Sequence, residues 1–328
     1  MGASRVYKPH VLFPRPMSDY PMSDYRVAEG CRETPVSALR GHSMWVNSVA
    51  LSTSGDVGLS TACDTTSAVW GVDSEGKLSL RGGEDFPAAL SSTLSGDGKT
   101  CVVVGANGNC SVIDVQTSQL RSVLRGAARP LSLQSHAVSV SVDGRTAVVS
   151  GAHGTATCWD VHNNVVSHTL RGHRDSVSSV GISASGNIAL TGSLDKTARI
   201  WDLRKATHVR ILAGHSDAVR HVCLSASGSV VVTSSFDGTA NVWDTCILKP
   251  TLTTRNPPYF GVTDAMSGDG LFCATLGSAE TVRVWSTATG TTARVMRGSV
   301  RCVALNGDAC MVLTGTADGH VNLWSVWC

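Results

Sequence analysis

The chain has few charged side chains for its length. Of its 328 residues, 16% are Asp, Glu, Lys or Arg, whereas an average soluble domain has about 25%. Lys and Arg number 27 against 25 Asp and Glu, which gives a net charge of +2. The sequence therefore lacks the cationic track that would make nucleic acid the primary partner. Because 42% of the residues are hydrophobic, we expect a folded protein whose weakly charged surface is shared with protein partners.

Cysteine pairs at metal-binding spacing and long apolar runs are also absent. Eleven Cys are spread from Cys31 to Cys328 without a C-x-x-C pair, which fits neither a disulfide framework nor a zinc site and favours a reducing compartment. The first residues lack the apolar segment of a signal peptide, and no apolar run reaches the roughly 18 residues of a membrane span. We expect an intracellular, cytoplasmic protein with no metal and no membrane insertion.

Familiar catalytic and cofactor motifs are missing as well. Gly98-Lys99-Thr100 looks like the end of a phosphate-binding loop, but Thr93 stands where the first glycine of that loop belongs. His and Asp recur together three times at a spacing of 22 residues, and three copies indicate a structural repeat rather than one active site. We expect no catalytic residue, no cofactor and no small-molecule ligand.

What the sequence does contain is a repeat of about 42 residues. Leu-Arg-Gly-His at 39–42 returns at 170–173 and, as Leu-Ala-Gly-His, at 212–215. Tryptophans follow in step at 159, 201, 243 and 285, each 42 residues apart, with Trp70 before them and Trp324 after them. The 89 residues from Trp70 to Trp159 hold two units, with Ile113-Asp114 in place of one Trp-Asp pair. The chain therefore contains seven units.

Each unit has the pattern of short β-strands separated by tight turns. Turn pairs such as Ser54-Gly55 and Asp143-Gly144 separate β-branched runs such as 230–234. With its Gly-His and Trp-Asp signatures, the segment from about residue 34 to 328 resembles the WD40 repeat family. The resemblance implies an all-β, seven-bladed β-propeller with four antiparallel strands in each blade.

The spacing within the units supports this resemblance. Three His residues each precede an Asp by 22 residues, and in four units an Asp precedes a Trp by six residues. In the family such residues form a structural network in which Asp accepts a hydrogen bond from His and the indole bonds inside the blade. The network residues implied here are His42, Asp64, Trp70, His173, Asp195, Trp201, His215, Asp237, Trp243, Asp318 and Trp324.

Three units depart from the pattern, and the last one is incomplete. Asn107, His153 and Ala279 stand where the turn Asp belongs, so we expect these blades to be held by hydrophobic packing alone. After Trp324 only four residues remain, too few for an outer strand. We therefore expect residues 35–39 to complete the final blade and close the ring without a free edge.

Residues 1–33 form a second segment outside the ring. They hold four of the ten prolines and a direct repeat of Pro-Met-Ser-Asp-Tyr. We expect an extended N-terminal arm, with a disordered tail as the alternative. The arm is rich in aromatics for a tail, and the residues expected to bind a partner are Tyr7, Phe13, Tyr20 and Tyr25.

Several aromatic residues are not explained by the repeat. By the resemblance they fall in loops on the top face, around the central channel, together with nearby polar residues. Aromatic and Arg side chains carry most of the binding energy at protein interfaces, so this set predicts a partner-binding surface; filling of gaps between blades is the alternative. The set comprises Trp45, Asn47, Phe86, Arg129, His136, Arg174, Arg220, Phe236, Tyr259, Phe260 and Arg301.

Together these features favour a non-enzymatic scaffold or adaptor subunit that mediates protein–protein interactions in a larger intracellular assembly. The arm fits a stable architecture such as a ciliary or cytoskeletal one. A substrate-recognition receptor of a ubiquitin-ligase-type complex is the alternative, and an enzyme using the central channel is a remote one.

Overall fold

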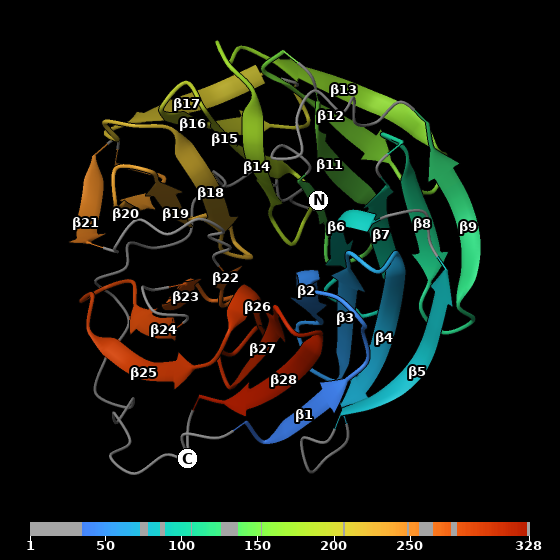
Figure 1. Ribbon diagram of the computed structural model, residues 1–328. Coiled ribbons are helices and arrows are strands. Elements are labelled where there is room, and N and C mark those ends of the chain that lie inside the picture. The colour runs from blue at the N-terminus through green and yellow to red at the C-terminus, as the bar shows by residue number, and fades with distance from the viewer. Residues whose placement is uncertain are drawn as a thin grey trace, which may run out of the picture.

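The computed structural model is a ring of seven β-sheets around a central axis (Figure 1). It describes residues 35–72, 78–85, 89–105, 107–125, 137–151, 153–205, 207–247, 249–255, 265–276 and 281–326. Each sheet has four antiparallel strands, as expected from the repeat. Within the described part of the chain, no helix is long and apolar enough to cross a membrane.

The strands follow the chain in sets of four, one set for each blade. In blades 1 to 3 they are β2 (Val46–Leu51), β3 (Val57–Ala62), β4 (Thr66–Val72), β5 (Leu78–Asp85), β6 (Ala89–Leu94), β7 (Thr100–Gly105), β8 (Cys110–Asp114), β9 (Gln119–Leu124), β10 (Val138–Val140), β11 (Thr146–Ser150), β12 (Thr155–Asp160) and β13 (Val165–Arg171). In blades 4 to 6 they are β14 (Val177–Ile182), β15 (Ile188–Ser193), β16 (Thr197–Asp202), β17 (Thr207–Ala213), β18 (Val219–Leu224), β19 (Val230–Ser235), β20 (Thr239–Asp244), β21 (Pro250–Arg255), β22 (Ala265–Met266), β23 (Phe272–Leu276), β24 (Thr281–Ser286) and β25 (Thr292–Arg297).

Blade 7 is assembled from both ends of the ring. Its strands are β26 (Val300–Leu305), β27 (Met311–Thr316), β28 (His320–Ser325) and, as the outer strand, β1 (Ser37–Arg40). β1 runs antiparallel to β28, with Ser37 opposite Leu323 and Arg40 opposite His320. In Figure 1 the blue start of the ring lies beside its red end. The predicted closure is confirmed, with a strand that begins two residues and ends one residue later than expected.

The hydrophobic core lies between the blades. The fully buried Trp243 of blade 5, for example, packs with Leu190 and Ile200 of blade 4 in one cluster. At the joint of the ring, Trp70 of blade 1 packs with Leu313 and other side chains of blade 7. Because each sheet buries both faces against neighbours, small and β-branched residues fill most of this space and one large ring per blade is enough.

The two faces of the ring are built from different turns. The face that carries the connections between blades and the turns between second and third strands is called the top face here; the opposite face is the bottom face. On the bottom face, the turns after the inner strands are joined from blade to blade by backbone hydrogen bonds. The seven bonds run Thr53–Gly96, Asp97–Val142, Val142–Ala184, Ala184–Ala226, Ala226–Gly268, Gly268–Gly307 and Gly307–Thr53, at 2.8 to 3.4 Å. The seven blades are therefore linked around the axis at the bottom by main-chain contacts.

Candidate functional site

The predicted network of His, Asp and Trp is present in blade 4. The indole N–H of Trp201 donates to Thr191 Oγ1 at 2.9 Å, and Thr191 lies 2.8 Å from His173 Nε2. His173 Nδ1 lies 2.8 Å from a carboxylate oxygen of Asp195. The ionised Asp195 can only accept, so Nδ1 of His173 carries a hydrogen. Because the lowered pKa of His173 keeps its ring neutral, Nε2 accepts the hydroxyl hydrogen of Thr191. Blade 5 repeats the arrangement with Trp243, Thr233, His215 and Asp237.

Blade 1 contains a longer version of the same relay. Trp70 donates to Ser60 Oγ, which lies 2.7 Å from His42 Nε2. His42 Nδ1 reaches Thr66 Oγ1 at 2.7 Å, and Thr66 in turn donates to Asp64. The direct His42–Asp64 separation is 3.5 Å. The expected bond from His to Asp is therefore replaced in this blade by a bond through the Thr66 hydroxyl.

Blades 3 and 6 correct the expectation of packing alone, because each keeps an indole hydrogen bond. In blade 6 Trp285 donates to Thr275 at 3.2 Å, so this blade keeps the indole bond. In blade 3 Trp159 donates to Thr157 of its own strand, because Val149 takes the place of the inner hydroxyl. In blade 7 Trp324 donates to Thr314, the equivalent of Thr191, whereas Asp318 accepts from Thr316 and lies 3.0 Å from His320 Nδ1 instead of bonding a leading His. Of the turn residues that prompted the expectation, Ala279 lies outside the described residues.

The ring nitrogens of these histidines are not available for catalysis. His42 and His173 are 4% and 8% exposed, and both ring nitrogens of each are hydrogen-bonded. Burial lowers the pKa of His173, an effect that the neighbouring Asp195 only partly offsets. Burial also opposes ionisation of Asp195, but hydrogen bonds from Thr197, the backbone of Arg174 and His173 outweigh it and lower the pKa of Asp195 to about 2. The network is structural.

We expect the stability of the ring to fall in two stages as the pH falls. Since the folded pKa values of His42 and His173 lie below 6.5, the unfolded chain takes up protons first and stability is lost below about pH 6.5. The pKa values of Asp64 and Asp195 are about 2 in the fold against 3.8 when unfolded. The ionised carboxylates therefore stabilise the fold above about pH 4, and this contribution, at most about 2 kcal/mol each and reduced by solvent screening, is lost as the pH falls towards 2. Melting temperatures recorded from about pH 8 to about pH 2.5 measure both stages, and Asp195→Asn is expected to reduce the second. A melting temperature that stays level down to about pH 4 would contradict the first.

The inner strands carry an extra residue where they begin on the top face. In five blades the pairing between the first and second strands shifts register at this point. Such a bulge redirects a side chain out of the ladder. The five bulge residues are Asn47, Leu90, Ser178, Arg220 and Arg301.

Two bulge residues link neighbouring blades. Asn47 of blade 1 donates to the Ala89 carbonyl of blade 2 at 3.2 Å. Ser178 of blade 4 donates in the same way to the Val219 carbonyl of blade 5 at 2.6 Å. Ala89 and Val219 each stand immediately before the bulge residue of the neighbouring blade. The side chains of Asn47 and Ser178 therefore bond carbonyls that the bulge leaves unpaired in the strand ladder. For Asn47 the structure thus favours the alternative of filling a gap between blades.

The two bulge arginines instead stack on aromatic rings. The guanidinium of Arg220 lies 5.2 Å from the ring centre of Phe236 in the same blade. Arg301 of blade 7 lies 4.5 Å from the ring centre of Trp45 in blade 1. Such cation–π contacts hold an Arg and an aromatic ring in a fixed mutual position. Trp45 and Arg301 are exposed, whereas Arg220 and Phe236 are half-buried.

The structure places six of the predicted top-face residues. Four form the two stacked pairs and Asn47 bridges blades; the sixth, Arg174, is exposed beside the network, where its backbone N–H donates to Asp195. The other predicted partner-binding residues lie outside the described part of the chain or have side chains that it does not describe: Phe86, Arg129, His136, Tyr259, Phe260, Tyr7, Phe13, Tyr20 and Tyr25.

Two exposed residues of this region were not predicted. Met44 precedes Trp45 and is 48% exposed. Cys63 is exposed, and its thiol donates to Asn47 Oδ1 at 3.1 Å. Alignment of the units on the Gly-His pair would have found Met44, because the two units with the same signature have Asp at this position.

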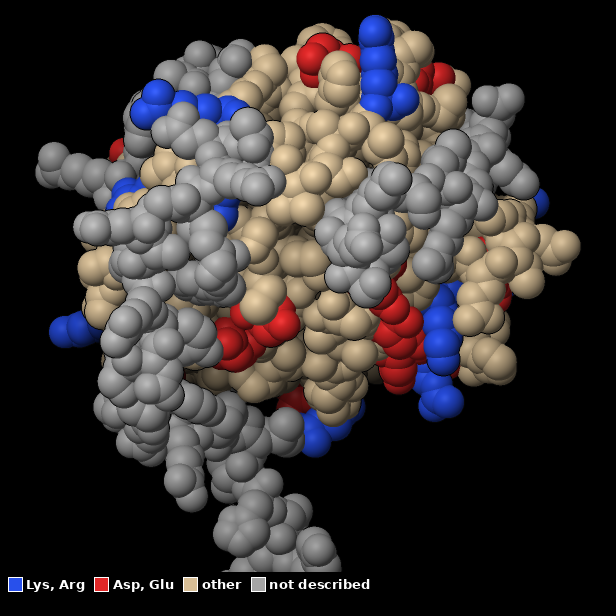
Figure 2. All heavy atoms as spheres, turned by 90° about the horizontal axis from the view of Figure 1, so that it is seen from below, with Lys and Arg blue, Asp and Glu red and all other residues tan. Residues whose placement is uncertain are grey.

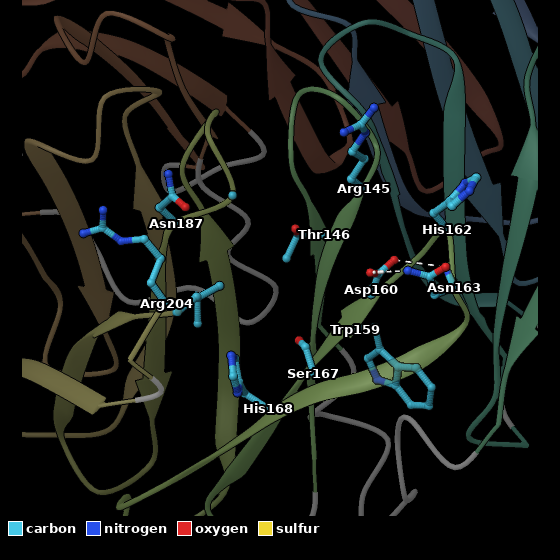
Figure 3. A pocket seen from close by; sticks show the side chains of 12 residues that line it. Arg145, Thr146, Trp159, Asp160, His162, Asn163, Ser167, His168, Asn187 and Arg204 are labelled. Carbon is cyan, nitrogen blue, oxygen red and sulfur yellow. Dashed lines mark hydrogen bonds between the residues drawn. The ribbon is translucent and has the colours of Figure 1, made fainter.

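The bottom face has a hollow between blades 3 and 4. It measures about 530 Å³ and is bordered by Arg145 and Arg204, with Thr146 and Ser167 between them (Figure 3). Each arginine faces a carboxylate of its own turn: Asp143 at 3.9 Å and Asp202 at 3.3 Å. Their charges are therefore already paired, and the hollow presents no excess of one sign.

Comparison with known families identifies the repeats. The family described as WD domain, G-beta repeat matches residues 33–71, 164–202, 206–244 and 290–325. None of the curated proteins compared with the chain matches it. The matched segments supply most of blades 1, 4, 5 and 7, the four in which an Asp occupies the turn. With the seven-bladed ring, these matches show that the chain is a WD40-repeat protein. Propellers of this class are in general non-enzymatic scaffolds that bind other proteins.

Proposed function

We propose that the chain is a non-enzymatic scaffold subunit that holds a protein partner on the rim of its top face, within a larger intracellular assembly. The observation that carries the proposal is the pair of bulge arginines, each stacked on an aromatic ring. A stacked Arg is already ordered before binding, so less conformational entropy is lost when a partner covers it. Arg and large aromatic residues are also the commonest energetic anchors of protein interfaces.

The charge distribution supports a protein partner rather than a nucleic acid. On the face seen in Figure 2, Lys and Arg stand singly or beside Asp and Glu, separated by uncharged residues. Neither Arg220 nor Arg301 forms an ion pair with a carboxylate of the described residues, whereas Arg121, Arg145 and Arg204 do. The rim therefore offers isolated cations next to apolar rings, which suits a polypeptide better than a phosphate backbone.

The proposal includes a cytoplasmic location, in an assembly such as a ciliary or cytoskeletal one. No disulfide joins any two of the nine cysteines in the described part of the chain, which suits a reducing compartment. The Pro-rich and Tyr-rich residues 1–33 would supply a second attachment to the same assembly.

We expect Arg220→Ala, Phe236→Ala and Trp45→Ala, made one at a time, each to reduce partner recovery from native lysate at least tenfold. Truncation of a well-buried interface anchor typically costs about 2 kcal/mol or more, which corresponds to about a thirtyfold loss of affinity. Arg145→Ala on the bottom face is the matched control and should leave recovery unchanged, and melting temperatures would verify that each variant is folded.

The same purification separates the two candidate roles. A scaffold subunit is recovered with its partners in fixed stoichiometry, whereas a substrate receptor of a ubiquitin-ligase-type complex binds its substrate transiently and in variable amounts. Retention of every partner by all three rim variants would remove the proposal.

A further inference from the structure

The connection between blades 7 and 1 departs from its own repeat. After the Gly-His pair, blade 5 continues with Ser216-Asp217-Ala218, whereas blade 1 continues with Ser43-Met44-Trp45. Blade 4 has Asp175 and Ser176 at the last two positions. Only in blade 1 do two large apolar side chains follow each other here among these three units.

The fold does not require the two apolar residues. The backbone of the connection is alike in the three blades: Trp45, Ser176 and Ala218 each accept, through the carbonyl, a hydrogen bond from the backbone N–H of the following turn, at 3.0 to 3.1 Å. In blade 5, the carboxylate of Asp217 also accepts from the backbone N–H of Ala218 at 2.8 Å. Blade 1 gives up this local bond and leaves Met44 and Trp45 48% and 43% exposed. The fold therefore accepts small or polar residues at these positions, and two adjacent exposed apolar side chains mark a candidate interaction surface.

A positive charge lies directly on the exposed indole. Arg301 stacks on Trp45 from blade 7, and it has no ion pair with a described carboxylate. The carboxylates of the two neighbouring turns already have partners. Asp64, whose side chain is 8% exposed, accepts from Ser43 and Thr66. Asp318, whose side chain is 64% exposed, accepts from Thr316 and lies 3.0 Å from His320 Nδ1. A partner would therefore meet an indole and a thioether beside a guanidinium that has no carboxylate of its own.

We infer that Met44, Trp45 and Arg301, named here the seam patch, bind an extended segment of a partner protein in which an Asp or Glu stands beside a large apolar residue. The apolar residue packs on Met44 and the indole, and the carboxylate pairs with the guanidinium already held over that ring. A single exposed Arg on an apolar base suits one carboxylate rather than a polyanion. The inference rests on the proposed function and gives it a partner chemistry.

The seam patch also bridges the joint of the ring. Met44 and Trp45 belong to blade 1, and Arg301 belongs to blade 7. A ligand that contacts both blades binds only while the ring is closed, so it stabilises the closed ring by linkage. Binding at this place is therefore expected to raise the melting temperature, as binding of any ligand specific for the folded ring does.

The test is a selection from a phage-displayed library of random peptides on the full-length protein. The matched variant carries Met44→Asp together with Trp45→Ala, which gives blade 1 the Ser-Asp-Ala sequence that blade 5 already accommodates, so the variant is expected to fold. Selected peptides should be enriched in Asp or Glu beside Leu, Met or an aromatic residue. The selected peptides should bind the double variant at least tenfold more weakly than the wild type, and they should also bind Arg301→Gln more weakly. They should raise the melting temperature of the wild-type protein but not that of the double variant.

Three results would overturn the inference: no enrichment, enrichment of basic peptides, or equal binding to the wild type and the double variant. Failure here is distinguishable from failure of the proposed function. If the library yields no enriched peptide while Arg220→Ala and Phe236→Ala still reduce partner recovery from lysate, the proposed partner binding at the rim stands and the seam patch is excluded as a binding site.

Discussion

Deletion of residues 1–40, which removes β1, is expected to lower the melting temperature of the whole ring by about 8 °C. β1 pairs with β28 over four residues, and Val36 adds a backbone bond to Leu323 at 2.8 Å. Leu39 also packs against the cluster that joins blades 7 and 1. At about 1 kcal/mol for each backbone bond and somewhat more for the leucine, the loss is about 5 kcal/mol. At about 2.1 cal/mol/K of unfolding entropy per residue, a ring of this size shifts by roughly 1.6 °C for each kcal/mol, which gives about 8 °C.

The matched control is deletion of residues 1–33, which leaves β1 in place and should leave the melting temperature unchanged. Differential scanning calorimetry of the two deletions and the full chain makes the comparison. The ring would melt as one unit because its blades share their cores. If the longer deletion melts like the full chain, ring closure by β1 has no energetic importance.

Ser60→Ala is expected to destabilise the ring by about 3 kcal/mol although it removes a single oxygen atom. Ser60 is fully buried, and its hydroxyl bonds both the indole N–H of Trp70 and Nε2 of His42, each at 2.7 Å. Alanine would remove the partner of two buried polar groups at once, and each such group costs about 1 to 3 kcal/mol. Urea unfolding monitored by tryptophan fluorescence measures the loss.

Ser60→Thr is the control for this prediction, because Thr191 and Thr233 fill the same place in blades 4 and 5. It keeps the hydroxyl and is expected to cost less than about 1 kcal/mol. Equal destabilisation by Ala and Thr would show that packing at this site matters and the hydrogen-bond relay does not.

The ring and its closure were predictable because they follow from properties that the sequence states directly. The number of blades follows from the repeat, and the position of β1 follows from an outer strand that the last unit lacks and the first residues supply. The resemblance to the WD40 family, supported by the spacing of 22 residues, likewise implied the bond between His173 and Asp195 that the structure contains.

The details of the network were less predictable because they depend on single hydroxyl groups. Thr275 gives blade 6 an indole bond that neither Gly-His nor Trp-Asp signals, and Thr66 enters the relay of blade 1 between His42 and Asp64. Thr275 could be found by looking for a hydroxyl ten residues before each repeat Trp, and Thr66 by looking for one two residues after each turn Asp.

The predicted top-face residues divide according to what their bulge positions require. A bulge residue in the inner strand does not change the length of the unit, so the repeat spacing hides it. Once the bulges are known, Asn47 is seen to fill a bonding gap between blades, whereas Arg220 and Arg301 turn to aromatic rings. The polar residues predicted on the top face therefore include both a structural residue, Asn47, and candidate binding residues, Arg220 and Arg301.

Site-specific photo-cross-linking in native lysate tests the central claim, that partners dock on the top rim, most directly. A photoreactive amino acid would replace exposed Met44 on the top face and, in a second protein, exposed Ile247, which follows the last residue of β20 by three positions on the bottom face. The account predicts a discrete cross-linked partner from position 44 that is absent from position 247 and is lost when Arg301→Gln is added. Cross-links from position 247 with none from position 44 would contradict it.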